Sequence, residues 1–544
     1  MASILYVSGP PGQNGSNGIS STTASTKTFI PITASCAGDG VTDDRVAFQN
    51  LINAVASSGG GEIYIPSGTY NLSKSPNGFF NLLVSGNITL TGAGKNVTTL
   101  MQASGTAGSV RLLATTGSNI TIKNLTLDGN KSNMSVDEHR AGIFANETYG
   151  LQISNIVSKN FTGDGIQLYN NVFDVYMQGC LIEQNDRDGI SFTAPVNGAY
   201  VNNVTIVGNT IRNNAVQQID SEPGAGGLTT NVHIVGNQIG VDSNDRGIDS
   251  YIVTVAAAKA WTIASNELNG TVEVIFSEDV TISNNVIDNY SSSSTVFCYY
   301  SNKNISICNN IIRFKNPSST NQAGLYVVAV NPNYQTTSLT FCGNVVDCSG
   351  SHASTFGALI KGANDILISD NVFIGPASAS DAGVGAGITV RPTMNITNAI
   401  ISNNYISEFG RIGIDVIGGA SGSGLQIANL SINGNTFNDS SGTMKTGISL
   451  TDSTTTIAPA QISLIGNTFL GGVTTQIKSY PVSASILIGG NRNAGAIYTI
   501  SGSSPLNVVT GSIGDVCYRL DGGSNTTMYV KESGFKTTSG WTAK

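Results

Sequence analysis

The chain has 544 residues, of which 40% are apolar and only 11% are charged, and its net charge is −8. A balance this acidic argues against nucleic acid as a partner, because binding nucleic acid calls for a basic face. It does not exclude an acidic polysaccharide, since a local arginine or histidine can still bind a sugar carboxylate. The abundance of Gly, Asn, Ser and Thr favours short strands and turns over helices.

The start of the chain, MASILYVSGPPG, has no basic region followed by a long apolar run, so we expect no signal peptide. No stretch approaches the roughly 18 apolar residues of a membrane span, so we expect no membrane partner. The cysteines lack metal-type C-x-x-C spacing, and Cys180, Cys298, Cys308 and Cys342 lie in strand-like runs. We therefore expect reduced buried thiols, folding in a cytoplasm, and no metal or cofactor.

Residues 9–20, GPPGQNGSNGIS, form four consecutive Gly-X-Y triplets. Glycine at every third position is the requirement of a collagen triple helix, where only glycine fits at the axis. Four triplets are too few to hold a triple helix unaided. The run is therefore either a flexible tether or a short stalk that a trimer elsewhere keeps in register. We assign residues 1–35 to an attachment and linker segment.

An amphipathic helix is predicted from about residue 44 to residue 56, with Phe48 and Val55 among the apolar residues on one face. Thr42 to Asp44 can cap its start, and the glycines at 59–61 end it. The next segment, EIYIPSGTY, has the pattern of strand, turn, strand. A solenoid must cover its open end, and this helix suits that role.

A pattern of apolar, x, apolar, x, x, Asn, x, apolar recurs through the centre of the chain, as in VTIVGNTI at 204–211 and ISLIGNTF at 462–469. The period of about 25 to 34 residues, without helical segments between copies, indicates a parallel β-helix. A β-propeller is the alternative, but it needs a steadier period of about 40 residues. We expect each repeated asparagine to adopt a left-handed turn conformation and to stack its amide on the next coil. These asparagines are Asn209, Asn237, Asn266, Asn285, Asn310, Asn344, Asn371, Asn404, Asn435 and Asn467.

The segments GDGVTDD at 38–44 and GGGEIYIPSGTY at 59–70, with the helix between them, resemble the amino-terminal signature of the pectate-lyase-like right-handed β-helix superfamily. Without a signal peptide, the chain is similar to the tailspike depolymerases of bacteriophages. The resemblance implies an all-β, right-handed parallel β-helix over residues 36–495, a homotrimer, and attachment to a phage tail or baseplate through the amino-terminal segment. It does not define the chemistry, because the superfamily contains lyases, hydrolases, epimerases and non-catalytic binders.

A second set of repeats carries carboxylates and aligns on Ile166, Ile190, Ile219 and Ile248. If each isoleucine points into one coil, the residues one and three positions later point outward from one sheet. The outward residues are then Gln167 and Tyr169, Ser191 and Thr193, Asp220 and Glu222, and Asp249 and Tyr251.

Asp220 and Glu222 would lie on one face of one strand, with Cβ atoms roughly 6 to 7 Å apart and Asp249 one coil away. Such crowding raises the pKa of at least one carboxyl group and gives a protonated acid beside an ionised base. Glycoside hydrolysis needs that pair, and the spacing allows an inverting or a retaining geometry. IDSEP at 219–223 also resembles an I-D-x-E-P motif of polysaccharide-acting β-helix proteins. The alternative is a merely solvated acidic face.

Asp164 and Asp188 join the catalytic candidates, although each precedes a glycine and turn formation alone would explain it. Arg187 and Arg246 flank the aligned strands and either bind substrate or pair with neighbouring acids. Tyr169 and Tyr251 are candidates for sugar stacking.

The polar segment at 128–144 is predicted to be a loop that overhangs the sheet. His139 and Arg140 in this loop are candidates for contact with an acidic sugar, and a solvated loop is the alternative.

A lyase needs a base that removes the proton α to a uronate carboxyl and a group that neutralises that carboxylate. Pectate lyases of the superfamily use calcium-binding aspartates and an arginine, and here Asp164, Asp188 and Arg187 match only part of that set. Hydrolysis is therefore the favoured reaction.

After Asn491 the sequence changes character, and CYRL at 517–520 and TMYVKES at 527–533 predict a hairpin around DGGSN. With Trp541, residues 496–544 resemble the small β module that closes many phage-type fibre proteins, where a solenoid cap and a trimer contact are both expected.

The predicted function is a tailspike-type depolymerase of the virion tail that binds and cleaves a bacterial surface polysaccharide. The alternatives are a lyase or epimerase that acts on a uronate-containing glycan, and a non-catalytic adhesin.

Overall fold

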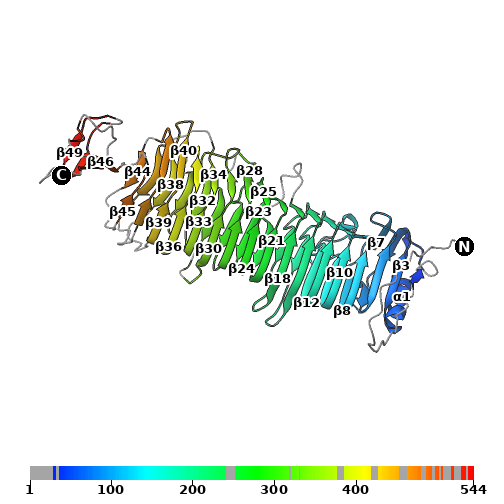
Figure 1. Cartoon of the computed structure of the whole chain (residues 1–544). Helices are drawn as coiled ribbons and strands as arrows, with labels where there is room; N and C mark the ends of the chain where they lie inside the picture. Colours follow the sequence, from blue (N-terminus) through cyan, green and yellow to red (C-terminus); the bar gives the residue numbers. More distant parts are fainter. Residues whose placement is uncertain are drawn as a thin grey trace, which may run out of the picture.

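The chain forms a long parallel β-solenoid with an α-helix at its amino-terminal end and a small separate sheet at its carboxyl-terminal end (Figure 1). The predicted all-β parallel β-helix is therefore confirmed, and the homotrimer stays a prediction. The computed structural model describes residues 29–31, 36–76, 78–240, 251–317, 320–329, 331, 333–376, 385–417, 427–451, 462–473, 475–479, 486–492, 497–500, 504–506, 516–519, 528–534 and 537–544. The Gly-X-Y run lies outside the described residues.

Two series of parallel strands run along the solenoid, and we call them the first and the second ladder. They share three long strands and together make a sheet of 29 strands. The shared strands are β8 (Arg111–Lys123), β10 (Ile143–Ser154) and β12 (Ile166–Gln178). The remaining strands of the first ladder are β5 (Phe80–Ser85), β14 (Ile190–Phe192), β17 (Ile219–Ser221), β20 (Tyr251–Ala256), β23 (Thr271–Ile275), β26 (Val296–Tyr299), β29 (Ala323–Val328), β32 (Phe356–Ile360), β35 (Ala386–Val390), β38 (Ile412–Ile417), β41 (Thr446–Thr451) and β44 (Thr475–Ser479). The second ladder adds β1 (Phe29–Pro31), β3 (Gly61–Ile65), β6 (Ile88–Gly92), β15 (Tyr200–Val207), β18 (Leu228–Val235), β21 (Ala258–Ala264), β24 (Glu278–Ser283), β27 (Lys303–Cys308), β30 (Thr336–Cys342), β33 (Ala363–Ser369), β36 (Ile396–Ser402), β39 (Ile427–Asn433), β42 (Ile462–Ile465) and β45 (Ile486–Gly489).

A third side of the solenoid is a parallel sheet of 16 short strands. They are β2 (Asp39–Asp43), β4 (Gly68–Leu72), β7 (Thr98–Gln102), β9 (Thr126–Asp128), β11 (Val157–Lys159), β13 (Leu181–Glu183), β16 (Thr210–Arg212), β19 (Gln238–Gly240), β22 (Glu267–Asn269), β25 (Val286–Asn289), β28 (Ile311–Phe314), β31 (Val345–Asp347), β34 (Val372–Ile374), β37 (Tyr405–Ser407), β40 (Thr436–Asp439) and β43 (Thr468–Gly471). A short 3-10 helix, η2 (Lys131–Asn133), lies in the predicted loop.

Alternation along the strands of the first ladder decides which side chains fill the core. Ile166, Ile190 and Ile219 stack on one another in register and are fully buried, as predicted. Side chains at the neighbouring positions point outward because successive residues of a strand face opposite sides. The next partner of Ile219 is Val253 rather than Ile248, so the predicted alignment of the fourth repeat is wrong.

The repeated asparagines form a continuous internal ladder, as predicted. The Asn209 amide donates to the Asn237 Oδ1 at 3.0 Å, and the same bond recurs from coil to coil as far as Asn491. The left-handed residue is the one before each asparagine, as at Gly208, so the left-handed turn lies one position earlier than predicted. Each amide thereby satisfies buried backbone groups that the turn leaves unpaired.

The helix α1 (Arg45–Ser57) covers the open end of the solenoid through Phe48, Ile52 and Val55, which are buried. It contacts β3, β5 and β6, and this confirms the predicted cap. Asp44 precedes the helix without capping it, because its carboxylate accepts the backbone N–H groups of residues 37 and 38.

The carboxyl-terminal sheet contains β46 (Ile497–Ile500), β47 (Val516–Arg519), β48 (Met528–Lys531) and β49 (Trp541–Ala543). The strands β47 and β48 pair antiparallel, as the predicted hairpin requires, and Trp541 packs with Cys517 and Tyr529.

Cys308 and Cys342 occupy paired positions on β27 and β30 and form a disulfide. The expectation that every cysteine is a reduced thiol is therefore wrong for this pair. Cys180 and Cys298 are buried and free, as expected. Among the described residues, no helix has the length and hydropathy that a membrane span requires.

Candidate active site

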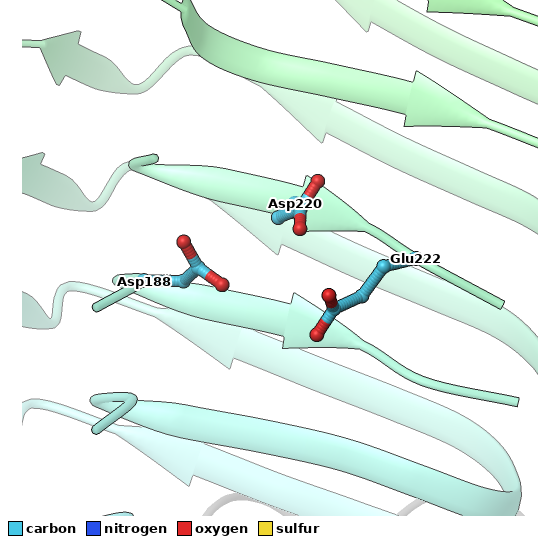
Figure 2. A group of neighbouring side chains, drawn as sticks. All are labelled: Asp188, Asp220 and Glu222. Carbon is cyan, nitrogen blue, oxygen red and sulfur yellow. The ribbon is translucent and has the colours of Figure 1, made fainter. Parts of the chain in front are cut away.

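Five charged side chains gather on the outer face of the first ladder, around β14 and β17. Asp164 lies just before β12, Arg187 and Asp188 lie just before β14, Asp220 is on β17 and Glu222 follows it. Asp164, Asp188 and Asp220 are almost completely buried, whereas the Glu222 side chain is 37% exposed. Figure 2 shows Asp188, Asp220 and Glu222 pointing toward one another from neighbouring strands.

Arg187 is the cation at the centre of this cluster. Its guanidinium donates to both oxygens of Asp164, at 3.1 and 3.2 Å, and to Glu222 Oε1, and it lies 3.6 Å from Asp188 Oδ2. Burial lowers the pKa of Arg187, but the neighbouring carboxylates, Asp164 first, outweigh burial and raise that pKa. Of its two predicted roles, pairing with neighbouring acids is therefore the one that the geometry displays.

Asp164 and Asp188 are held by more than turn geometry. Ser191 Oγ donates to Asp164 at 2.7 Å, and the backbone N–H of Gln217 donates to Asp188 Oδ1 at 3.0 Å. The other oxygen of Asp188 is buried and has no hydrogen-bond partner among the described residues. Burial raises the pKa of Asp164. Burial, followed by repulsion from Asp164 and Asp220, raises the pKa of Asp188 to about 8.

Asp220 lies in the predicted outward row, between Ser191 on one side and Thr254 on the other. Burial, followed by the nearby Glu222, raises its pKa to about 7. A buried acid with this pKa keeps a proton near neutrality and can donate it to a bound molecule. The predicted protonated carboxyl group therefore has two candidates, Asp188 and Asp220.

Glu273 on β23 is a further carboxylate of this row that no sequence motif predicts. It pairs with Thr254, two coils from Asp220 along the same outward row, and burial raises its pKa to about 7. The signal was present in TVEVI, where an acidic residue occupies the outward position of an otherwise apolar strand.

Aromatic side chains lie on both sides of the carboxylates. Tyr169 is half-buried and packs on Phe144, with the ring centroids 5.1 Å apart. The Arg111 guanidinium lies over the Phe144 ring, 4.6 Å from its centroid. Beyond Glu273 the outward row continues with Phe297 and Tyr326. Sugar rings pack readily on such aromatic faces, so the row has the composition of a glycan-binding surface.

The other predicted contacts are placed differently. Asp249 and Arg246 lie outside the described residues. Tyr251 begins β20, before the position that pairs with Ile219. His139 is exposed beside Glu138. Arg140 is fully buried and donates to the backbone oxygen of residue 106, so its position does not fit the predicted contact with a sugar.

The trio of Asp188, Asp220 and Glu222 has the composition of a cation site. Each residue offers one carboxylate oxygen, and these atoms lie within 4.8 Å of one another. Oxygen ligands of this kind suit a hard cation such as Ca²⁺. Two of the three carboxyl groups have raised pKa values, however, so near neutrality protons compete for the same oxygens. The expected absence of a metal stays a prediction.

Fold and site together define a parallel β-solenoid with a buried carboxylate cluster on the outer face of one sheet. Residues 33–295, which contain this cluster, match the family model described as Rhamnogalacturonase A/epimerase, pectate lyase-like. That segment is therefore similar to the pectate-lyase-like β-helix family, in agreement with the amino-terminal motif.

Mannuronan C5-epimerase AlgE6 of Azotobacter vinelandii is 29% identical over 178 residues, which are 31% of this chain and 20% of the epimerase. Alginate lyase 7 of the same organism is 25% identical over 181 residues, 31% of this chain and 21% of the lyase. The aligned part is thus about a fifth of the length of either relative. Tailspike protein 3 of bacteriophage CBA120 has a TM-score of 0.40 and 14% identity, over 95% of this chain and 68% of the tailspike. At that score the likeness adds no argument about function.

Proposed function

We propose that the protein is a polysaccharide-modifying enzyme whose reaction takes place at Asp188, Asp220 and Glu222. The observation that supports this most directly is the pairing of two buried carboxyl groups of raised pKa with a third that is partly exposed. A proton donor and a second carboxylate beside the same bond are what acid–base cleavage of a glycosidic linkage needs.

In the favoured reaction, glycoside hydrolysis, Asp220 protonates the leaving oxygen. Asp188, just before the neighbouring strand β14, is fully buried and keeps its own proton near neutral pH. Glu222 is the most exposed of the three, and Arg187 holds its carboxylate in place as the nucleophile or base. One oxygen of each carboxyl group in the trio lies within 4.8 Å of one oxygen of the others, which is closer to the roughly 5 to 5.5 Å of a retaining pair than to the roughly 6.5 to 9.5 Å of an inverting pair.

Glu273 provides a different pairing with Asp220. Two strand steps of about 4.8 Å separate their backbones by roughly 10 Å, which is closer to the inverting range. Inversion therefore requires Glu273, and retention requires Glu222.

Elimination or epimerisation of a uronate is the second candidate, because the sequence relatives are named as mannuronan epimerases and an alginate lyase. Both reactions begin with removal of the proton α to a carboxylate and need that carboxylate neutralised. Arg187 already forms ion pairs with three acids of the cluster, so it is not free to neutralise a uronate carboxylate. We therefore favour hydrolysis over elimination or epimerisation.

The test incubates the full chain with mannuronan and with capsules from a panel of bacterial strains. New reducing ends without ultraviolet absorbance indicate hydrolysis, both signals together indicate elimination, and a changed uronate configuration by NMR without cleavage indicates epimerisation. The variants Asp220→Asn and Glu222→Gln should each lower turnover by about 10² or more. Glu267→Gln, an exposed acid on β22, is the matched control and should retain full activity.

Turnover that survives the loss of both Asp220 and Glu222 would contradict the site. Binding to a capsule without any of the three products would favour the adhesin instead.

The setting we propose is a bacteriophage tailspike that acts on a bacterial surface polysaccharide as a homotrimer of the virion tail. The Gly-X-Y triplets support this proposal. Sedimentation of the full chain tests it, since a monomer in solution would contradict both the trimer and the threefold stalk.

A further inference from the structure

The outward row that carries Asp220 leads along the first ladder to a second site of different chemistry. Each residue of the row pairs in register with the next, from one coil to its neighbour. From Asp220 the row runs through Thr254, Glu273, Phe297, Tyr326, Leu359, Thr389 and Asp415 to Ser449 and Lys478. One continuous surface therefore joins the carboxylate cluster to the far coils of the solenoid.

A pocket of about 760 Å³ opens over the end of this row. Its described lining contains five cationic side chains and a single carboxylate, Asp415. The cations are Lys361, Arg391, Arg411, Lys445 and Lys478. Such an excess of positive charge stands out in a chain of net charge −8, and it favours an anionic occupant. The pocket also lies beyond residues 33–295, the segment that resembles the pectate-lyase-like family.

The floor of the pocket is apolar and pre-formed. Phe356, Leu359 and Ile412 pack together on the outside of the sheet, with Tyr326 against them. The Lys361 ammonium lies 5.0 Å from the centre of the Tyr326 ring and donates to its hydroxyl at 2.9 Å. An apolar floor with a cationic rim fits a ligand that has a carbon face and acidic substituents.

Two polar atoms in this pocket are buried without a hydrogen-bond partner among the described residues. They are Thr389 Oγ1, in a residue only 2% exposed, and Asp415 Oδ1. A buried polar group is normally paired, and an orphan at the wall of a pocket marks a place where a ligand can supply the partner. The hydroxyl groups of a sugar can donate to both oxygens.

We propose that this pocket binds a uronate-bearing segment of the same polysaccharide chain that reaches the carboxylate cluster. The proposal rests on the proposed function for the identity of that chain, but not on which reaction takes place there. Arg391 and Arg411 would bind a sugar carboxylate, while Thr389 and Asp415 would accept from sugar hydroxyls. Seven strand steps separate Asp220 from Asp415, about 34 Å along the ladder, so only a chain of several sugars spans both sites.

The test measures equilibrium binding to the full-length Asp220→Asn protein, in which the pocket is intact and turnover does not interfere. The probes are mannuronan and polygalacturonate, with dextran as the neutral polymer and inorganic sulfate as the free anion. A double variant, Arg391→Gln with Arg411→Gln, removes two pocket cations. The matched control, Lys259→Gln with Lys303→Gln, removes two exposed cations from the second ladder.

The pocket variant should bind both uronate polymers at least tenfold more weakly, because it loses the charge-assisted hydrogen bonds of two guanidinium groups to sugar carboxylates. The control should bind as the parent protein does. Thr389→Val should also bind more weakly without a lower melting temperature, since its hydroxyl has no hydrogen-bond partner to lose among the residues that the structure describes. Inorganic sulfate should not compete at the concentrations that saturate the uronate polymer.

Equal losses in the pocket and control variants would overturn the proposal, since they would show only attraction between net charges. Failure of the parent to bind either uronate polymer, or equal binding of dextran, would also overturn it. These outcomes are distinct from a failure of the proposed function, which appears as absent turnover in the wild-type protein whether or not the pocket binds.

Discussion

Replacing Asp220 with asparagine should remove a charge whose burial weakens the fold, and it should do so in a pH-dependent way. Asp220 is 6% exposed, and burial raises its pKa from 3.8 to about 7. Its pKa is therefore higher in the folded chain than in the unfolded chain. In the wild type, stability related to this proton is fully present below the unfolded pKa and is lost as the pH rises through about 7.

The size of the effect follows from the difference between the two pKa values. Each pKa unit corresponds to 1.36 kcal/mol, so the wild type loses at most roughly 4 kcal/mol between pH 4 and pH 8 through this group. Asparagine has no proton to lose. The Asp220→Asn protein should consequently exceed the wild type in stability by up to that amount at pH 8, and by almost nothing at pH 4.

The measurement is the urea midpoint of each full-length protein at pH 4, 6 and 8, with the slope checked for constancy. Asp365→Asn, an exposed acid on β33, is the matched control and should show no such trend. A gain that is equal at pH 4 and pH 8, or absent at pH 8, would refute the argument that burial raises this pKa.

Three further predictions concern the polar and covalent interactions that stabilise the fold. Arg187→Gln should lower stability by about 3 to 5 kcal/mol at pH 7, because the buried Asp164 and the partly exposed Glu222 lose the cation that donates to them. The loss in urea midpoint should shrink at pH 4, and a loss independent of pH would contradict this. Asn310→Ala should lower the free energy of unfolding by about 3 kcal/mol, because it leaves buried donors and acceptors of the asparagine ladder unpaired. Replacing the exposed Asn398 with alanine should lower it far less, and equal urea midpoints for the two variants would contradict the role of the asparagine ladder. Thiol titration of the denatured, unreduced chain should find five free cysteines, since Cys308 and Cys342 are bonded; seven would show that this disulfide is absent.

The regular part of the fold was predictable from the sequence because its physical cause is local. Alternating apolar residues at a constant spacing place Ile166, Ile190 and Ile219 in the core, and the row of outward residues follows from that alternation. The alignment failed at the next coil. The sequence around Ile248 is similar to that of the preceding repeats, but the strand begins at Tyr251, and Val253 occupies the inward position that pairs with Ile219.

Contacts between coils were harder to predict than positions along one strand. Cys308 and Cys342 occupy the same place in successive repeats, and this shared position was the signal that they are neighbours in space. Glu273 was missed because its strand carries no motif, although its register relative to Asp220 follows from the same ladder. The pocket at Arg391 and Arg411 was not predicted either, because its residues come from separate coils and form no motif in the sequence.

The most direct test of the proposed site is the structure of the Asp220→Asn protein with a bound oligosaccharide from a polymer that the wild type converts. The glycan should lie along the outer face of the first ladder, with one linkage against Asp188 and Glu222 and its axis running toward Arg391. A glycan bound on the second ladder or on the 16-stranded sheet, with the carboxylate cluster empty, would contradict it.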